Sequence, residues 1–219
     1  MGAIPHVPEA VPAARPRRRL LRRWVVAVML GELAGFAVPT VVGGVAWALE
    51  PSPGVLYAVL VCAGACEGAV LAGAQWIVLR NPLPRLPARA WILATAAAAA
   101  LAWSLGMLPS TLGDRLEDVP LALLVPVSVA GGAVLLLSIG VAQSLVLRRH
   151  VVRAWRWVGA NVLAWCLGLV VSVSFMSILL TEDTTLGAAV GIGVTAGLLM
   201  GLTVALVTGW FLVRILDPR

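Results

Sequence analysis

The chain has 219 residues, of which 61% are hydrophobic and 12% are charged, and its formal net charge is +6. A soluble domain has about 45–50% apolar and about 25% charged residues, so this composition excludes a soluble globular protein and is typical of a membrane protein. All the positive side chains are arginines, and anionic lipid headgroups beside the membrane are their natural counterpart. We therefore expect no nucleic-acid partner.

Six apolar stretches follow one another, each long enough to cross a hydrocarbon core of about 30 Å. They occupy residues 24–49, 54–80, 90–108, 120–147, 157–180 and 186–214. The sequence predicts an all-α integral membrane protein in which residues 24–214 form one transmembrane domain. Residues 1–23 are rich in Pro and Arg and are expected to be a disordered basic cytoplasmic tail, and residues 215–219 a second cytoplasmic tail.

The arginines lie on one side of the spans, in every second loop and near both ends of the chain. All but one lie before the first span, between the second and third, between the fourth and fifth, or after the sixth. The exception, Arg115, is surrounded by Asp114, Glu117 and Asp118. Loops rich in arginine stay in the cytoplasm, so both termini are predicted to be cytoplasmic. We expect a multi-pass protein of the bacterial cytoplasmic (inner) membrane, with the lipid bilayer as its main partner.

The spans carry an internal repeat. A tryptophan opens each odd-numbered span and an arginine closes each even-numbered span, at a nearly constant period of 66–68 residues. These positions are Trp24, Trp91 and Trp157, and Arg80, Arg148 and Arg214. The period predicts three tandem two-helix hairpins, residues 24–80, 91–148 and 157–214. Because every hairpin leaves and returns on the same side, the three should be in parallel orientation, related by rotations of about 120° about the membrane normal.

The repeated motif also carries a resemblance. Residues 74–80 read AQWIVLR, residues 142–148 read AQSLVLR, and Trp-rich starts of the next spans follow both. This pattern resembles a loose set of uncharacterised bacterial polytopic membrane proteins with repeated Ala-Gln-Trp-x-Val-Leu-Arg motifs. The resemblance covers nearly all of residues 24–214, although the third copy, residues 208–214, lacks the glutamine. It implies a membrane location and no particular activity.

Two acidic residues inside the spans are the candidates for proton or cation binding. Glu67 lies about 20 Å from the end of its span at Arg80, and Glu32 lies about 12 Å past Trp24. An ionised carboxylate at this depth is costly, so each should be neutral, paired or facing water. Each glutamate is either a hydrogen-bonded packing residue or a proton or cation site, and the sequence leaves both readings open.

Small and polar residues are predicted to form helix contacts. Glycines at helical spacing let backbones approach closely, and they occur at Gly31, Gly35, Gly64, Gly68, Gly193, Gly197 and Gly201. Polar helix–helix contacts are expected at equal depth across the cytoplasmic turns, at Gln75, Gln143, Thr95 and Asn161. Tryptophans near the arginine-rich ends are expected to be interfacial anchors, namely Trp24, Trp76, Trp91, Trp155, Trp157 and Trp210.

Catalytic patterns are not found in the spans. Both histidines, His6 and His150, lie outside them, and Cys62 and Cys66 beside Glu67 provide too few ligands for a zinc site. We therefore expect no enzyme, no metal and no cofactor. Two functions lead: a small-solute or ion (proton or cation) pathway through the centre, and, as the alternative, a non-catalytic scaffold or accessory subunit. Either could form a homo-oligomer or pack against a partner membrane protein. An intramembrane enzyme acting on lipid comes last, because the spans lack bases and nucleophiles at one depth.

Overall fold

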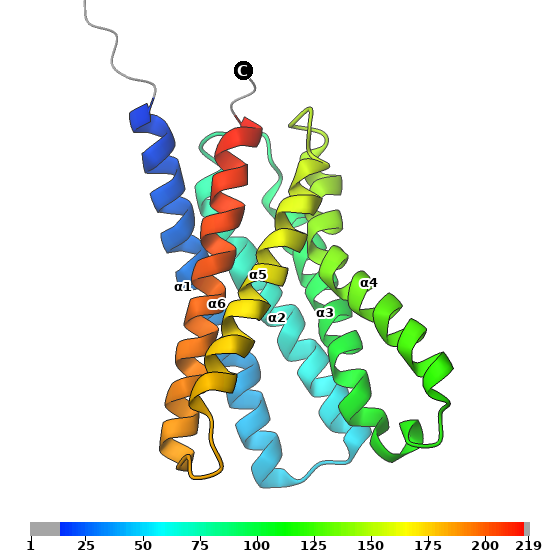
Figure 1. Cartoon of the computed structure of the whole chain (residues 1–219). Coiled ribbons are helices and arrows are strands. Elements are labelled where there is room, and N and C mark those ends of the chain that lie inside the picture. The colour runs from blue at the N-terminus through cyan, green and yellow to red at the C-terminus, as the bar shows by residue number, and fades with distance from the viewer. Residues whose placement is uncertain (1–13, 217–219) are drawn as a thin grey trace, which may run out of the picture.

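The computed structural model describes residues 14–216, apart from the side chains of residues 14–16, 47 and 114. Six long helices form this part of the chain (Figure 1): α1 Ala14–Leu49, α2 Pro53–Leu79, α3 Ala88–Leu112, α4 Leu121–Leu147, α5 Arg156–Leu179 and α6 Leu186–Leu216. A short 3-10 helix, η1 Gly113–Leu116, joins α3 to α4. Each long helix has the length and hydropathy of a membrane span. The chain is a polytopic membrane protein with six candidate spans, which brings it into contact with the lipid bilayer.

The first helix begins earlier than the sequence predicted. It starts at Ala14, so residues 14–23 are helical, and the expected disordered tail is wrong for this stretch. Arginine is a good helix former, and a proline at position 16 is tolerated because it lies in the first turn, where no backbone bond is lost. Residues 1–13 of the predicted tail lie outside the described residues. At the other end, residues 215–216 belong to α6, and residues 217–219 are not described.

The third span is longer than predicted. It continues through Pro109 to Leu112, where the sequence analysis ended it at residue 108. The helix ends at Gly113, which has a φ of 37° and whose N–H bonds the carbonyl of Pro109. A glycine with positive φ closes a helix without steric cost, so it ends α3 more effectively than the proline in its last turn.

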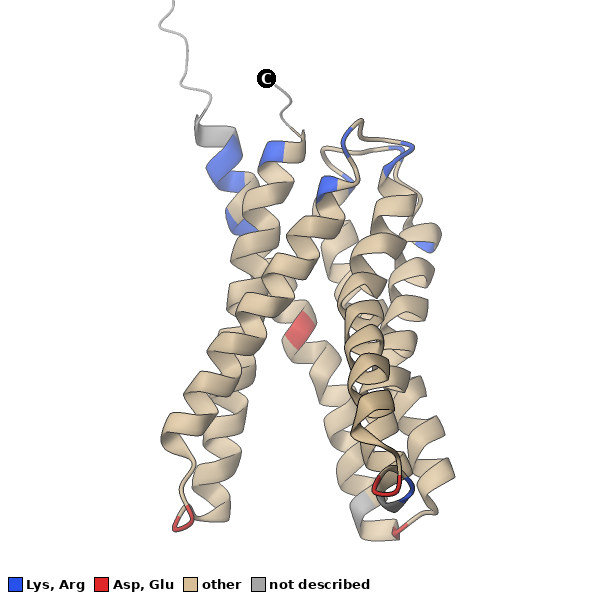
Figure 2. Cartoon of the chain, turned by 45° about the vertical axis from the view of Figure 1, so that its right-hand side comes forward, with Lys and Arg blue, Asp and Glu red and all other residues tan. Residues whose placement is uncertain are grey.

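The six helices form a closed ring. Each packs against its neighbours in the chain, and α1 also packs against α6. The odd-numbered helices run away from the end that holds the described chain termini, and the even-numbered helices return (Figure 1). Figure 2 shows arginines at this end, called the arginine end below, and acidic loops at the opposite, acidic end. The described exception is Arg115, which lies in η1.

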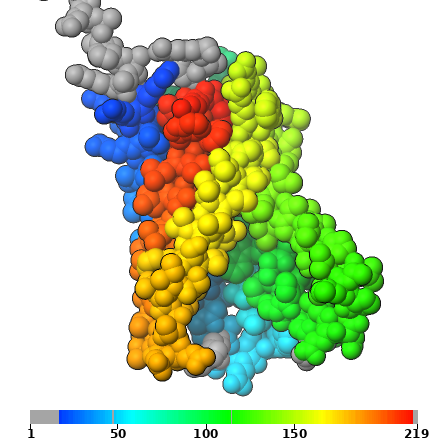
Figure 3. Space-filling view, viewed as in Figure 1, coloured from blue at the N-terminus to red at the C-terminus, as the bar shows by residue number. Residues whose placement is uncertain are grey.

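The ring is tightly packed at the arginine end and open at the acidic end. In α4 the buried residues are Gly140, Gln143 and Leu147, all in its last third. Those of α3 all lie within its first half. The space-filling view shows a hollow between α4 and the α5–α6 pair toward the acidic end (Figure 3). The helices therefore converge on a core beside the arginines and enclose a space beyond it.

Three tryptophans form the centre of this core. Trp24, Trp91 and Trp157 are each 0% exposed, and the rings of Trp24 and Trp157 meet edge to face with centroids 5.7 Å apart. Their predicted role as interfacial anchors is wrong, because none of the three reaches lipid or headgroups. Trp155 and Trp210 are exposed, as an anchor requires.

Candidate functional site

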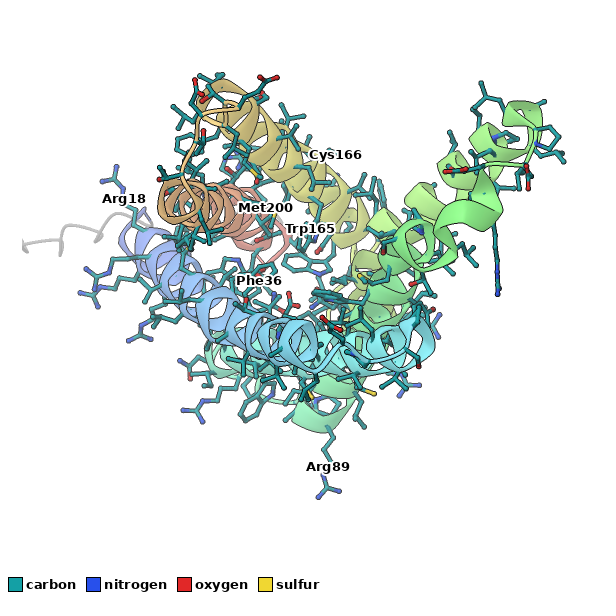
Figure 4. The ribbon with its side chains drawn as sticks, turned by 90° about the horizontal axis from the view of Figure 1, so that it is seen from below. Arg18, Phe36, Arg89, Trp165, Cys166 and Met200 are labelled. Carbon is teal, nitrogen blue, oxygen red and sulfur yellow. The ribbon has the colours of Figure 1, made fainter. Side chains whose placement is uncertain are left out.

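A central cavity lies among α1, α2, α3, α4 and α5. Its volume is about 340 Å³, and most of its wall is aliphatic or small. The exceptions are two acids and a set of large, polarisable side chains: Glu32, Glu67, Phe36, Trp103, Met107 and Trp165. Figure 4 shows Phe36 of α1, Trp165 of α5 and Met200 of α6 facing the space within the ring, whereas Arg18 and Arg89 point outward. An apolar cavity with a few convergent polar groups is the usual form of a ligand site.

Glu67 is held in place by one hydrogen bond and one close helix contact. Its side chain is buried, and its Oε2 accepts a 2.9 Å bond from the indole N–H of Trp103 on α3. Its Cγ would lie 3.1 Å from a Cβ built on Gly35 of α1, so the glycine leaves room for the acidic stem. The sequence placed Glu67 at mid-membrane but did not identify Trp103 as its partner.

Glu32 has no such partner. It is 5% exposed, and neither of its carboxyl oxygens makes a hydrogen bond within the described part of the chain. Its stem lies 3.7 Å from the position of a Cβ on Gly201 of α6, at ordinary contact distance. The two carboxyl groups line the same cavity. A buried carboxyl without a hydrogen bond is unfavourable, and a bound positive group would relieve it.

Glu32 also borders a second space. A groove of about 530 Å³ runs between α1 and α6, and Glu32 and Phe36 line both this groove and the central cavity. On the α6 side its wall contains Gly193, Gly197 and Gly201. The unpartnered carboxyl therefore stands where the cavity meets the gap between the first and last helices.

The predicted glycine contacts divide into two groups. An added Cβ on Gly31, Gly35, Gly64 or Gly68 would meet a neighbouring helix within 2.0–3.1 Å, so these four lie in close helix contacts. Gly193 and Gly197 have no atom within 4 Å of that position. Their predicted packing role is therefore wrong, because α1 and α6 diverge here and the glycines line the groove. A Cβ on Gly201 would lie at ordinary contact distance, 3.7 Å, from the stem of Glu32.

A buried polar layer lies between the cavity and the arginine end. Gln143 is 0% exposed, and its Nε2 donates to Gln75 Oε1 at 2.9 Å and to Thr95 Oγ1 at 3.0 Å. Its Oε1 accepts a 2.8 Å bond from the indole N–H of Trp157. One side chain of α4 thus joins α2, α3 and α5. The fourth residue of the predicted set, Asn161, donates instead to the carbonyl of Trp157 in its own helix.

The interface of α1 and α6 completes this layer. The indole N–H of Trp24 donates to Thr208 Oγ1 at 3.0 Å. A Cβ on Gly209 would lie 2.8 Å from Cδ1 of Trp24, so a glutamine could not occupy this position without moving the indole. The missing glutamine of the third motif copy therefore has a steric reason. The indole N–H of Trp91 has no partner among the described side chains.

Phe36, Trp103 and Trp165 were not predicted as site residues from the sequence. The available signal was the repeat: Trp165 lies eight residues past Trp157, as Glu32 does past Trp24, and Trp103 aligns with them if four alanines of the third span are an insertion. Cys62 and Cys66, considered beside Glu67 as metal ligands, are exposed while Glu67 is buried, so they face away from the cavity. No protein-family model, curated protein or solved structure matches this chain.

Proposed function

We propose that the protein is a pathway for protons, cations or a small cationic solute through the bacterial cytoplasmic membrane. The observation that carries the proposal is the pair Glu32 and Glu67, two buried carboxyls on adjacent helices that line one cavity. Glu32 has no hydrogen-bond partner among the described residues. Ionisable residues inside a membrane domain usually mark ion or substrate paths because they are too costly to keep otherwise.

We also propose that the pathway follows the axis of three repeated hairpins. Equivalent positions of the hairpins support this arrangement. Glu32 and Trp165 lie eight residues past Trp24 and Trp157, and Phe36 and Trp103 lie twelve residues past Trp24 and Trp91; all four line the central cavity. The opening tryptophans Trp24, Trp91 and Trp157 are all fully buried. A cavity reached by equivalent positions of different units is what a rotation about one central axis produces.

Two surface grooves give independent support to the repeat. One lies between α1 and α2, and the other between α3 and α4. Their walls use the same repeat positions: Ala27, Leu30, Gly31, Gly73, Ala74 and Ile77 in the first, and Ala94, Ala97, Ala98, Val141, Ala142 and Leu145 in the second. The offsets are 67 residues on the odd helix and 68 on the even helix, which are the offsets of the motif.

The charge distribution supports an orientation for the pathway. We propose that the arginine end, with both chain termini, faces the cytoplasm. In that orientation the open acidic end faces outward, and the layer around Gln143 separates the cavity from the cytoplasm. The layer lies eight residues from the acids, between Glu67 and Gln75 on α2, which is about 12 Å along the helix. Passage of a solute would require this layer to separate.

Flux through proteoliposomes tests the proposal. The purified protein is reconstituted, and gradients of protons, sodium, potassium or choline are imposed while internal pH and uptake are followed. Wild type should move at least one of these cations faster than protein-free liposomes. Glu67→Gln keeps the size of the side chain and its capacity to accept the Trp103 bond but removes the charge, so this flux should be lost. Glu50→Gln, at an exposed acidic residue in the loop after α1, is the matched control. Absence of flux for every cation would contradict the proposal.

One observation favours the alternative of a scaffold or accessory subunit. The most apolar window of α4 has no buried residue, so this helix offers an apolar face with little cover from its own chain. Lipid or a partner membrane protein, including a second copy, would suit that face equally. Co-purification of a stoichiometric membrane partner, together with no flux, would support this function over the pathway.

A further inference from the structure

We propose that the central cavity binds a hydrophobic organic cation, such as a quaternary ammonium or an aromatic amine, and receives it from the membrane through the groove between α1 and α6. This inference rests on the proposed function and names its substrate class. It combines three features of the structure: the unpartnered carboxyl of Glu32, the aromatic wall of the cavity, and the continuity of the cavity with the groove.

The donor set argues against a metal ion as the ligand. Calcium requires about 6–8 oxygen ligands and magnesium a near-octahedral set, and both are bound mostly by carboxylates, carbonyls and water. The described residues contain no cluster of three or more His, Cys, Asp or Glu that could hold a metal. Two carboxyls in an apolar cavity instead suit a cation whose charge is enclosed by hydrocarbon, because such an ion is weakly hydrated.

The aromatic side chains provide the second recognition element. Phe36, Trp103 and Trp165 come from three different helices and line the same cavity as the two glutamates. Cations are attracted to the faces of aromatic rings, and aromatic cages are a general means of binding quaternary ammonium groups. The bond from Trp103 to Glu67 fixes the indole beside the carboxyl. A single ligand could therefore contact a negative group and ring faces at once.

The groove provides access from the bilayer. Several of its wall residues are exposed on the membrane-facing surface of the ring, including Leu33 at 57% and Val41 at 65%. At Gly193 and Gly197 of α6 the groove is open, since a Cβ built on either glycine would have no atom within 4 Å. Hydrophobic cations accumulate at anionic membrane surfaces, so a lateral opening would meet them at high local concentration. Glu32, shared by groove and cavity, is the first charged group on this route.

The test compares two ligands of the same shape. Benzyltrimethylammonium is a quaternary cation, and neopentylbenzene is its neutral carbon analogue. Binding of each to the purified, detergent-solubilised protein is measured by equilibrium dialysis. We expect saturable binding of the cation to wild type. Binding to Glu32→Gln and to Glu67→Gln should be weaker by about tenfold or more, because the loss of a buried charge interaction typically costs at least the free energy that corresponds to a tenfold change in affinity. Glu50→Gln should bind like wild type. The neutral analogue should bind wild type and all the variants with the same affinity.

A second pair of variants tests the aromatic wall. Trp165→Phe keeps a ring and Trp165→Leu removes it, so the leucine variant should bind the cation about fivefold to tenfold more weakly than the phenylalanine variant, the range expected for one cation–π contact. Monodisperse elution of each variant establishes that it is folded.

Four outcomes decide the inference. Loss of cation binding in both glutamine variants supports the inference. Saturable cation binding by wild type without any flux also supports it, but would contradict the transport proposal. Equal binding by wild type and the glutamine variants overturns the inference. Flux of protons or metal cations with no saturable binding of benzyltrimethylammonium also overturns it, while leaving the transport proposal intact.

Discussion

The indole N–H of Trp103 donates a 2.9 Å hydrogen bond to the carboxyl of Glu67, joining α3 to α2 inside the membrane domain. Glu32 on α1 lines the same cavity without any such bond among the described residues. The two acids are therefore unequal. Trp103 stabilises Glu67, whereas Glu32 is available to a ligand. This difference underlies the predictions for the site.

Gly64 sets the position of Trp103. A Cβ on Gly64 would lie 2.0 Å from Cδ1 of the indole, so Gly64→Ala must displace the ring and weaken its bond to Glu67. We expect a destabilisation of about 1–3 kcal/mol, as for other overpacked sites, together with weakened cation binding. Gly73→Ala, on the same helix with no atom within 4 Å of its Cβ, is the control and should be neutral or slightly stabilising. Thermal unfolding in detergent measures both. Equal melting temperatures for the two variants would show that the Trp103 indole can be displaced without loss of stability.

Gln143 is expected to hold the arginine end of the ring together. Gln143→Leu removes three interhelical bonds, which at about 0.6 kcal/mol each predicts a loss of about 2 kcal/mol in the free energy of unfolding. Thr195→Val is the control, because this exposed side chain bonds only the carbonyl of Gly191 in its own helix. Denaturant titration in mixed micelles gives both values. A Gln143→Leu protein as stable as wild type would mean that the polar layer contributes nothing to packing.

The arginine distribution predicts the membrane orientation. Reporters fused after Arg219 or inserted within residues 82–88 should give a cytoplasmic signal, and a reporter at residues 112–118 should give an outside signal, because arginine-rich loops remain in the cytoplasm. A paired phosphatase and fluorescent-protein readout measures each site. An outside signal from residues 82–88 would invert the orientation assumed for the pathway.

Filling the groove between α1 and α6 should slow ligand access without harming the fold. Gly197→Leu places a side chain in the groove where no atom lies within 4 Å of the Cβ position. We expect its melting temperature to stay near that of wild type while the association rate of benzyltrimethylammonium falls several-fold. Gly187→Leu, also unobstructed but outside the groove, is the control. Unchanged association rates in stopped-flow mixing would show that the ligand uses another route.

The sequence predicted the elements of the fold well because membrane spans depend on local composition. Six spans, the arginine asymmetry and the depth of Glu67 all follow from hydropathy and from a rise of about 1.5 Å per residue. The start of α1 was missed because ten arginine-rich and proline-containing residues resemble a disordered tail, although arginine itself favours helix.

Side-chain partners were harder to predict because they depend on how far the helices diverge. Trp24, Trp91 and Trp157 were expected at the membrane surface, but the helices converge at this end and bury them. Gly193 and Gly197 were expected in a tight contact, but α1 and α6 separate beside them. The pairing of Trp103 with Glu67 joins residues 36 positions apart, and no local pattern encodes it.

Chemical modification of the two buried glutamates tests whether both acids bind the cation. Dicyclohexylcarbodiimide is a hydrophobic reagent that adds to a carboxyl group and leaves a stable acylurea on it. With the protein in liposomes, mass spectrometry should find the adduct on Glu32 and Glu67, and benzyltrimethylammonium should suppress it where neopentylbenzene does not. Glu50, which is exposed, is the internal reference for modification from water. If Glu32 and Glu67 bind the cation, it should protect both acids from modification; adducts that form at the same rate with and without the cation would show that neither acid binds it.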